Sequence, residues 1–322
     1  MDNAECSTAL VTHQLAEREI SSNYTTDIAS DGDVILVVGA STRRFRVHSL
    51  ILKNASPVFK ALLSPNFAEG QLLLANADPV EIPLPEDHAD ALSIICHVLH
   101  GRNDGVPEPI DGPVLVSVAI AADKFDLAVP LQYAIQEWLQ CGSVSDAKKL
   151  WHLMIAAYWF GNDAKFSEIT QALVLHHAGS YRQLAFESNL DADVILKICS
   201  QLSLEEERSQ LRLNLLQILS DASTFACRTC PCGWNAKHTL KFVESLRWGT
   251  LLSPQYMRAG TVWKAIEGVR EIELPTPEYL DTACPNTHYH GVWNNVRGYL
   301  AKEIDKLKSN GGLQLTCLNQ GG

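Results

Sequence analysis

The sequence predicts an α+β protein in which a small β-sheet and a cluster of helices are followed by a mostly α-helical C-terminal region. Runs of β-branched residues and apolar–polar alternation, both typical of strands, fall within residues 34–84. From Leu92 onwards, apolar residues recur with the spacing of amphipathic helices. The chain has 322 residues, of which 46% are hydrophobic and 20% are charged, so it can bury sizeable cores.

Three segments have the patterns of strands. The run Val34–Gly39 follows Asp31-Gly32-Asp33, is rich in β-branched residues and ends at glycine, which predicts a buried strand. Arg44–Val47 alternates polar and apolar residues and predicts the returning strand of a hairpin. Val80–Leu84 alternates again, and its Pro83 has no N–H to donate, so we expect this strand at a sheet edge or a strand end.

Helices are predicted between and after these strands. A short helix is expected over His48–Asn54, and a second begins with Ser56 as N-cap and Pro57 at the first helical position. Phe59 falls on the buried side of this second helix. Further apolar stripes predict helices that include Leu92–Leu99, Val114–Lys124, Leu131–Leu139, Leu150–Tyr158, Leu211–Ala222 (after a capping box of Ser203 and Glu206) and Val292–Leu307.

Charge and composition exclude several classes of protein. Lys and Arg total 26 against 37 Asp and Glu, and this net charge of −11 argues against generic phosphate or nucleic-acid binding. The acidity lies in residues 1–226, with 29 acidic and 15 basic residues, whereas residues 227–322 hold 8 and 11. There is no run of 18 apolar residues and no signal peptide, and the nine cysteines favour reduced thiols or metal ligands. We expect an intracellular protein, cytoplasmic or nuclear, without a membrane partner.

The order of the N-terminal segments resembles the BTB/POZ family. The similar segments are Asp31–Gly39, Phe45–Leu52, Ser56–Leu63, Ala121–Leu127 and Glu137–Leu139. The resemblance implies a small three-stranded sheet packed on helices and a module for protein–protein interaction. With its helical extension and Cys/Trp-rich end, the layout is most similar to BTB proteins of filamentous fungi. It implies a flexible tail at 1–24, a BTB/POZ domain at 25–140, a helical extension at 141–226 and a Cys/Trp-rich region at 227–322.

The resemblance implies three alternative roles, none of them enzymatic. Many members of the family recruit substrates to cullin-type ubiquitin ligases, so the BTB domain would bind a cullin while the C-terminal region selects the protein to be ubiquitinated. A self-associating nuclear regulator and a scaffold without a ligase are the alternatives. Phosphate-binding and hydrolase motifs are absent from the sequence. A nucleic-acid partner is disfavoured because Lys237, Lys241 and Arg247 are sparse and Glu244 interrupts them.

Three residues are candidates for partner contacts. Cullin-binding members carry an apolar residue, any residue and glutamate after the helix that follows Ser-Pro, and Phe67-Ala68-Glu69 resembles this motif. Phe67 would enter an apolar pocket on the cullin, and Glu69 would make a polar contact or set the local backbone. Asp33 would either lie in a charged partner groove, as in BTB repressors, or, like His48, bond nearby backbone groups at the end of an element.

Other reactive side chains have simpler interpretations. Cys96 neighbours His97 but lies on the apolar stripe of its helix, so we interpret it as a small core residue and not as a nucleophile. His176 and His177 point in different directions on a helix and cannot jointly hold one ion, so we expect them to face water or to cap the helix.

A zinc site is the one predicted centre near the C-terminus. Cysteines and histidines form two clusters, and zinc prefers four such ligands in a tetrahedron. The expected ligands are Cys230, Cys232, Cys284 and His288, with Cys227 and His290 as alternates. Because the spacing matches no standard zinc finger, reduced cysteines packed beside Trp234 and Trp293 are the alternative.

Overall fold

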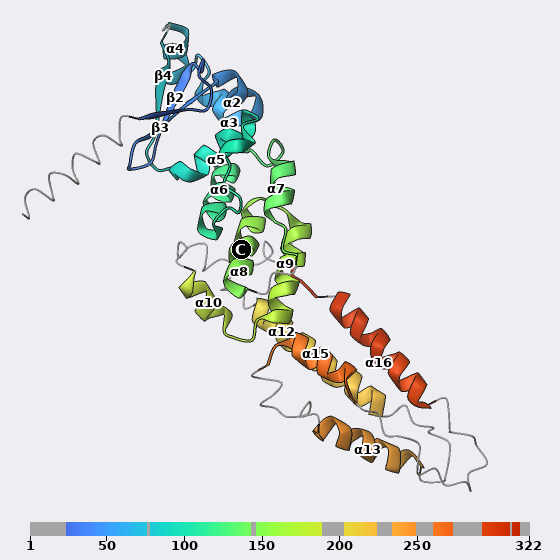
Figure 1. Ribbon diagram of the computed structural model, residues 1–322. Coiled ribbons are helices and arrows are strands. Elements are labelled where there is room, and N and C mark those ends of the chain that lie inside the picture. Colours follow the sequence, from blue (N-terminus) through green and yellow to red (C-terminus); the bar gives the residue numbers. More distant parts are fainter. Residues whose placement is uncertain are drawn as a thin grey trace, which may run out of the picture. The chain divides into compact units, whose positions relative to one another are not determined.

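The computed structural model describes residues 24–75, 78–142, 146–188, 203–223, 234–248, 260–272, 292–309 and 311–315. The chain divides into two compact units (Figure 1). The first comprises residues 1–142 and 155–162, and the second comprises residues 143–154 and 163–322. Within the described ranges, no helix combines the length and the apolar character needed to cross a membrane.

The first unit contains a mixed sheet of four strands in the order β1-β3-β2-β4. The strands are β1 (Thr25–Asp27), β2 (Val34–Val38), β3 (Arg43–Val47) and β4 (Val80–Leu84). β2 and β3 form the predicted antiparallel hairpin, with Val34 opposite Val47, whereas β1 pairs with β3 and β4 pairs with β2 in parallel. Pro83 therefore lies on an edge strand, as predicted.

The sheet has one strand more than the three that the resemblance implied. β1 is only three residues long and consists of Thr25, Thr26 and Asp27, so it has no apolar alternation that would reveal it. Its pairing with β3 depends on backbone hydrogen bonds, which leave no pattern in the side chains. The inward residues of β2 and β3 are buried as their alternation predicts.

Within the described residues, the first unit contains seven α-helices, three of them between β3 and β4 and four after β4. They are α2 (Ser49–Ala55), α3 (Pro57–Leu62), α4 (Ala68–Ala75), α5 (Ala89–Leu99), α6 (Gly112–Lys124), α7 (Gln132–Trp138) and α8 (Ala147–Trp159), which contributes residues to both units. All but α4 were predicted. The α4 sequence has a glycine in its middle and apolar residues on more than one side, so it shows no clear stripe.

The start of α3 agrees with the sequence in detail. The Ser56 hydroxyl accepts a hydrogen bond from the Phe59 N–H at 3.0 Å and donates to the Phe125 carbonyl. Phe59 is 1% exposed, and its ring stacks on that of Phe125 with the centroids 4.4 Å apart. The predicted N-cap and the predicted burial of Phe59 are therefore confirmed.

The second unit is helical in its described part. Its helices are α9 (Asp163–His176), α10 (Tyr181–Glu187), α12 (Ser203–Ser223), α13 (Trp234–Trp248), α15 (Val262–Arg270) and α16 (Val292–Ser309). α12 contacts α9, α13, α15 and α16, and therefore forms the centre of this unit (Figure 1). The predicted stripes of α12 and α16 are buried, namely Leu211, Leu215, Ile218 and Ala222 together with Val296, Leu300, Ile304 and Leu307.

Candidate functional site

Exposed apolar side chains occur along residues 58–74 of the first unit. Phe67 is 50% exposed and Leu74 is 75% exposed. Phe67 directly precedes α4, and its carbonyl accepts a hydrogen bond from the Gln71 N–H at 3.0 Å. Because seven positions make almost two helical turns, Phe67 and Leu74 lie on the same side of α4. Phe67 and Leu74 form an exposed apolar surface on this side of α4, interrupted by the exposed Gln71, that a partner protein can cover.

Gly70 fixes α4 in place. A Cβ atom on Gly70 would overlap the Ser64 carbonyl and come within 2.8 Å of the carbonyl carbon of Leu63. The Phe67 N–H also donates to the Ser64 carbonyl at 3.1 Å, which closes the turn between α3 and α4. The backbone of residues 63–70 therefore holds Phe67 at the surface, independently of any contact of its ring.

Glu69 lies in the first turn of α4 and is half-buried. A carboxylate at this position interacts favourably with the N-terminal end of the helix dipole. The role of Glu69 in setting the local backbone stays a prediction, and so does its contact with a cullin.

Asp33, the residue directly before β2, accepts hydrogen bonds from Ser49, the first residue of α2. The Ser49 N–H donates to Asp33 Oδ1 at 2.7 Å, and the Ser49 hydroxyl donates to Oδ2 at 2.6 Å. Burial raises the pKa of Asp33, but the hydrogen bonds from Ser49 more than offset this, so its pKa lies below the ordinary value. The interpretation of Asp33 as a residue that bonds local backbone is confirmed, while its contact with a partner stays a prediction.

His48 differs from the prediction that it bonds nearby backbone through its side chain. The Nε2 atom of His48 pairs with Asp31 Oδ1 at 3.1 Å instead. The backbone N–H of His48 donates to Nε2 of His100 at 3.0 Å. His100 Nδ1 lies 2.8 Å from the Cys96 carbonyl. Since His100 Nε2 must accept, its proton resides on Nδ1 and the ring is neutral. Burial lowers the pKa of His100, which favours the same neutral form.

Cys96 and the predicted metal ligands have different outcomes. Cys96 is buried, and burial raises the pKa of its thiol to about 12, so it is the core residue that its stripe predicts. The zinc candidates Cys227, Cys230, Cys232, Cys284, His288 and His290 all lie outside the described residues. Among the residues that the structure does describe, no group of three or more His, Cys, Asp or Glu side chains could hold a metal ion.

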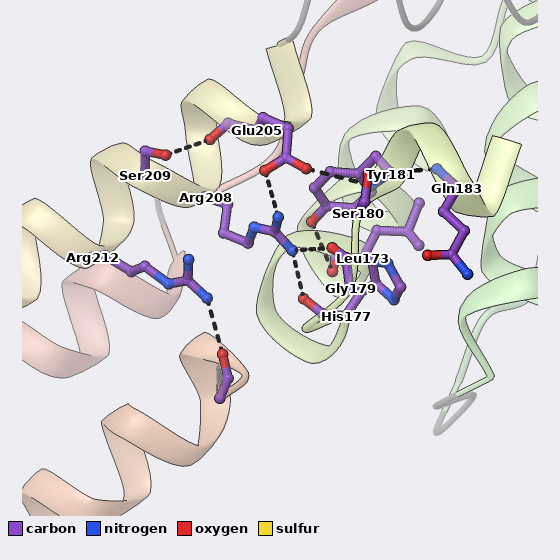
Figure 2. Close-up of polar contacts among 11 residues, drawn as sticks. Leu173, His177, Gly179, Ser180, Tyr181, Gln183, Glu205, Arg208, Ser209 and Arg212 are labelled. Carbon is purple, nitrogen blue, oxygen red and sulfur yellow. Dashed lines mark hydrogen bonds and ion pairs between the residues drawn. The ribbon is translucent and has the colours of Figure 1, made fainter. Parts of the chain in front are cut away.

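A polar cluster in the second unit surrounds Arg208 (Figure 2). Arg208 Nη1 donates to the carbonyls of His177 at 3.1 Å and Gly179 at 2.7 Å, and Nη2 pairs with Glu205. The guanidinium carbon lies 4.6 Å from the centroid of the Tyr181 ring, and the Arg208 side chain is only 7% exposed. Arg208 thus ties α12 to the loop between α9 and α10.

The same cluster satisfies the end of α9. The Tyr181 hydroxyl donates to the Leu173 carbonyl at 3.2 Å, and burial raises the pKa of this phenol, which keeps it a donor. Donors are needed here because the last carbonyls of a helix have no partner within the helix. We infer that the cluster is structural and positions α9 against α12.

The two histidines at the end of α9 contact different neighbours, as predicted, but each packs on an aromatic ring and is only partly exposed to water. His176 packs against Trp263 with ring centroids 5.0 Å apart, and His177 packs against Tyr181 at 5.2 Å. Both are half-buried, and burial lowers the pKa of each. The aromatic neighbours are distant in sequence or lie beyond the helix, so spacing alone did not reveal them.

The Arg208 cluster was missed from the sequence because Arg208 follows three glutamates and resembles part of a solvated helix face. A signal was nevertheless present. Arg208 stands four residues after Leu204 and three before Leu211, which places it on the buried stripe of α12. A charged residue on an apolar stripe predicts a buried partner for that charge.

Comparison with known proteins agrees with this fold. Residues 27–127 match the BTB/POZ domain family, a span that contains β2–β4 and α2–α6. None of the curated proteins matches the chain. The matched span also carries Phe67, Glu69 and Asp33. Residues 27–127 are therefore a BTB/POZ domain, a module for protein–protein interaction built here on a small mixed sheet of four strands.

Proposed function

We propose that the chain is an adaptor without catalytic activity, whose BTB/POZ domain binds the cullin of a ubiquitin ligase through Phe67 and Glu69. The second unit would then bind the protein to be ubiquitinated. The observation that carries the proposal is the position of Phe67, which is 50% exposed at the start of α4.

A fixed backbone makes this aromatic ring suitable for binding. Aromatic side chains are enriched in the cores of protein interfaces. Gly70 and the turn at Ser64 set the backbone of Phe67 before a partner arrives, so only the ring torsions are ordered on binding. Leu74 extends the apolar surface by a further turn of the same side.

Charge supports a basic partner surface. The 29 acidic residues of positions 1–226 outnumber the 15 basic ones, so this part of the chain attracts positively charged proteins. Such complementarity mainly speeds association and affects the final affinity less.

Affinity purification of the full tagged chain from cells, followed by mass spectrometry, tests the proposal. The wild-type protein should retain a cullin, and the double variant Phe67→Ala/Glu69→Ala should lose at least about tenfold of it, as expected for an interface anchor. Phe186→Ala is the matched control, because Phe186 is an 83% exposed aromatic outside the BTB/POZ domain. That variant should retain the cullin.

The same experiment separates the alternative roles. Chromatin proteins in place of a cullin would support the self-associating nuclear regulator. Other proteins with neither a cullin nor chromatin would support a scaffold. A wild-type chain that retains no cullin ends the adaptor proposal.

A further inference from the structure

The segment Gly311–Leu315, here called the strap, lies along α9 in the second unit (Figure 1). The Leu313 N–H donates to Thr170 Oγ1 at 2.9 Å, and the Leu315 N–H donates to Asp163 Oδ1 at 2.7 Å. Alternate amides of the strap are therefore bound by side chains of one helix. The strap is therefore held through its backbone on one face of α9.

The strap runs antiparallel to α9. A Cβ atom on Gly311 would meet the Gln171 side chain, whereas Leu315 is bonded to Asp163 at the other end of the helix. The strap therefore runs from the part of α9 that carries Gln171 to the first residue of the helix, Asp163.

Recognition of the strap uses its backbone and its glycines. Gly312 has a φ of +117°, and a Cβ atom there would overlap the Ser167 carbonyl and lie within 2.7 Å of Ser167 Oγ. Only glycine fits this position. Gln314, in contrast, is exposed, so its side chain is not read by α9.

The face of α9 is built to accept these amides. Thr170 is fully buried, and its hydroxyl donates to the Phe166 carbonyl at 2.8 Å, which leaves the oxygen free to accept from Leu313. Asp163 begins α9, where it accepts from Leu315 at the exposed end of the strap. The two acceptors bind the amides of Leu313 and Leu315, which have one residue between them, the exposed Gln314.

We propose that this face of α9 is a peptide-binding site for a partner protein that presents a Gly-Gly-apolar-x-apolar segment, and that the strap is its built-in competitor. The strap defines the chemistry of the partner because it occupies the site in the chain's own structure. Its residues are only half-buried or exposed, and two amides hold it, so a partner has few contacts to replace. The proposal does not depend on binding of a cullin.

Binding of a labelled peptide to the full-length chain tests this site. The probe is a fluorescent peptide with the sequence of residues 309–316, measured by anisotropy. Wild-type protein should bind it weakly, because a tethered competitor acts at a high effective concentration. Full-length Gly312→Val, whose strap cannot fit against Ser167, should bind the peptide at least about tenfold more tightly.

Two matched peptides check the recognition chemistry. A peptide in which the residue equivalent to Gly312 is valine should not bind, because its Cβ would overlap Ser167. A peptide in which the residue equivalent to Gln314 is alanine should bind as tightly as the original, because this side chain is exposed. Equal binding of all three peptides would contradict the proposed site.

A second variant tests whether displacing the strap frees the site if Gly312→Val does not fold. Leu315→Pro removes one amide donor of the strap without adding bulk beside Ser167. It should also bind the peptide more tightly than wild-type protein. If neither variant gains peptide binding, the strap is an ordinary part of the fold and the proposal is wrong.

Discussion

Phe59 and its neighbour Val58 allow a direct test of the core of the first unit at the scale of single residues. Phe59 is 1% exposed and stacks on Phe125, whereas Val58 is 39% exposed on the same helix. Phe59→Ala should lower the free energy of unfolding by about 3–5 kcal/mol, the usual cost of truncating a buried aromatic. Val58→Ala should cost well under that amount. Chemical denaturation measures both, and a loss below about 1 kcal/mol for Phe59→Ala would contradict its burial.

His100 predicts how the stability of the first unit depends on pH. Burial lowers the pKa of His100 in the folded state. Below the ordinary pKa near 6.5, His100 of the unfolded chain therefore binds more protons than His100 of the folded chain. The free energy of unfolding should therefore fall as the pH falls below that value, and the loss stops growing once the pH is below the folded pKa. Protonation of Nε2 would also remove the bond from the His48 N–H.

The measurement compares wild-type protein with His100→Gln between about pH 7.5 and 5. Gln keeps an acceptor at this position but does not titrate, so the variant should lose less stability than wild-type protein as the pH falls. Parallel curves for the two proteins would show that His100 contributes nothing to the pH dependence.

At the scale of elements, α4 depends on Gly70. Gly70→Ala should destabilise the first unit by about 1–3 kcal/mol, because the new Cβ overlaps the Ser64 carbonyl. It should also weaken cullin retention, since α4 and Phe67 must move. Gly298→Ala is the control, because Gly298 lies within α16 with no atom near the new Cβ, and it should stabilise the protein by about 0.5–1 kcal/mol. Unfolding curves that rank the two variants equally would contradict this role of Gly70.

The Arg208 cluster makes a second prediction at this scale. Arg208→Ala removes the ion pair with Glu205 and leaves the carbonyls of His177 and Gly179 without this donor, so it should cost about 1.5–3 kcal/mol. Arg182→Ala, an exposed arginine on α10, should change stability by less than about 0.5 kcal/mol. Thermal unfolding followed by circular dichroism distinguishes the two. A small effect of Arg208→Ala would show that water replaces the guanidinium at little cost.

Elements with a repeating side-chain pattern could be predicted from the sequence, and those held by backbone or by single contacts could not. The hairpin, β4 and the helix α3 with its Ser56 cap follow from alternation and capping residues. β1 is a three-residue strand that pairs with β3 through its backbone and one side-chain bond, from Arg44 to Thr25, and α4 is set by the contact of Gly70 with Ser64, so neither leaves a stripe. Phe67 and Glu69 could be singled out only through their resemblance to a family motif, whereas the Asp33–Ser49 bonds followed from the position of Asp33 at a strand end.

At the scale of the whole molecule, the C-terminal region carries the proposed zinc site. We propose that Cys230, Cys232, Cys284 and His288 bind one zinc ion. The two clusters lie about 50 residues apart, so the ion would close a long loop, and its binding free energy would add to the folding free energy of this region. This coupling predicts that loss of the metal also destabilises the region.

Elemental analysis of protein purified without added metal tests the zinc site. Wild-type protein should contain about one equivalent of zinc, and Cys230→Ser and Cys284→Ser should each lose it. Cys317→Ser, outside both clusters, should keep the metal. Wild-type protein without zinc would favour the reduced cysteines of the alternative interpretation.

The position of Pro83 has a consequence for how copies of this chain behave at high concentration. The Val80 N–H bonds the Asp33 carbonyl and the Leu84 carbonyl bonds the Gly39 N–H, so these residues of β4 face β2. By alternation, Glu81 and Pro83 face away from β2, and Pro83 offers no N–H there. A foreign strand that added to this edge would lose one hydrogen bond. Many copies of this domain can therefore be held close together by partners that bind its helices, without β4 of one copy pairing with a strand of another.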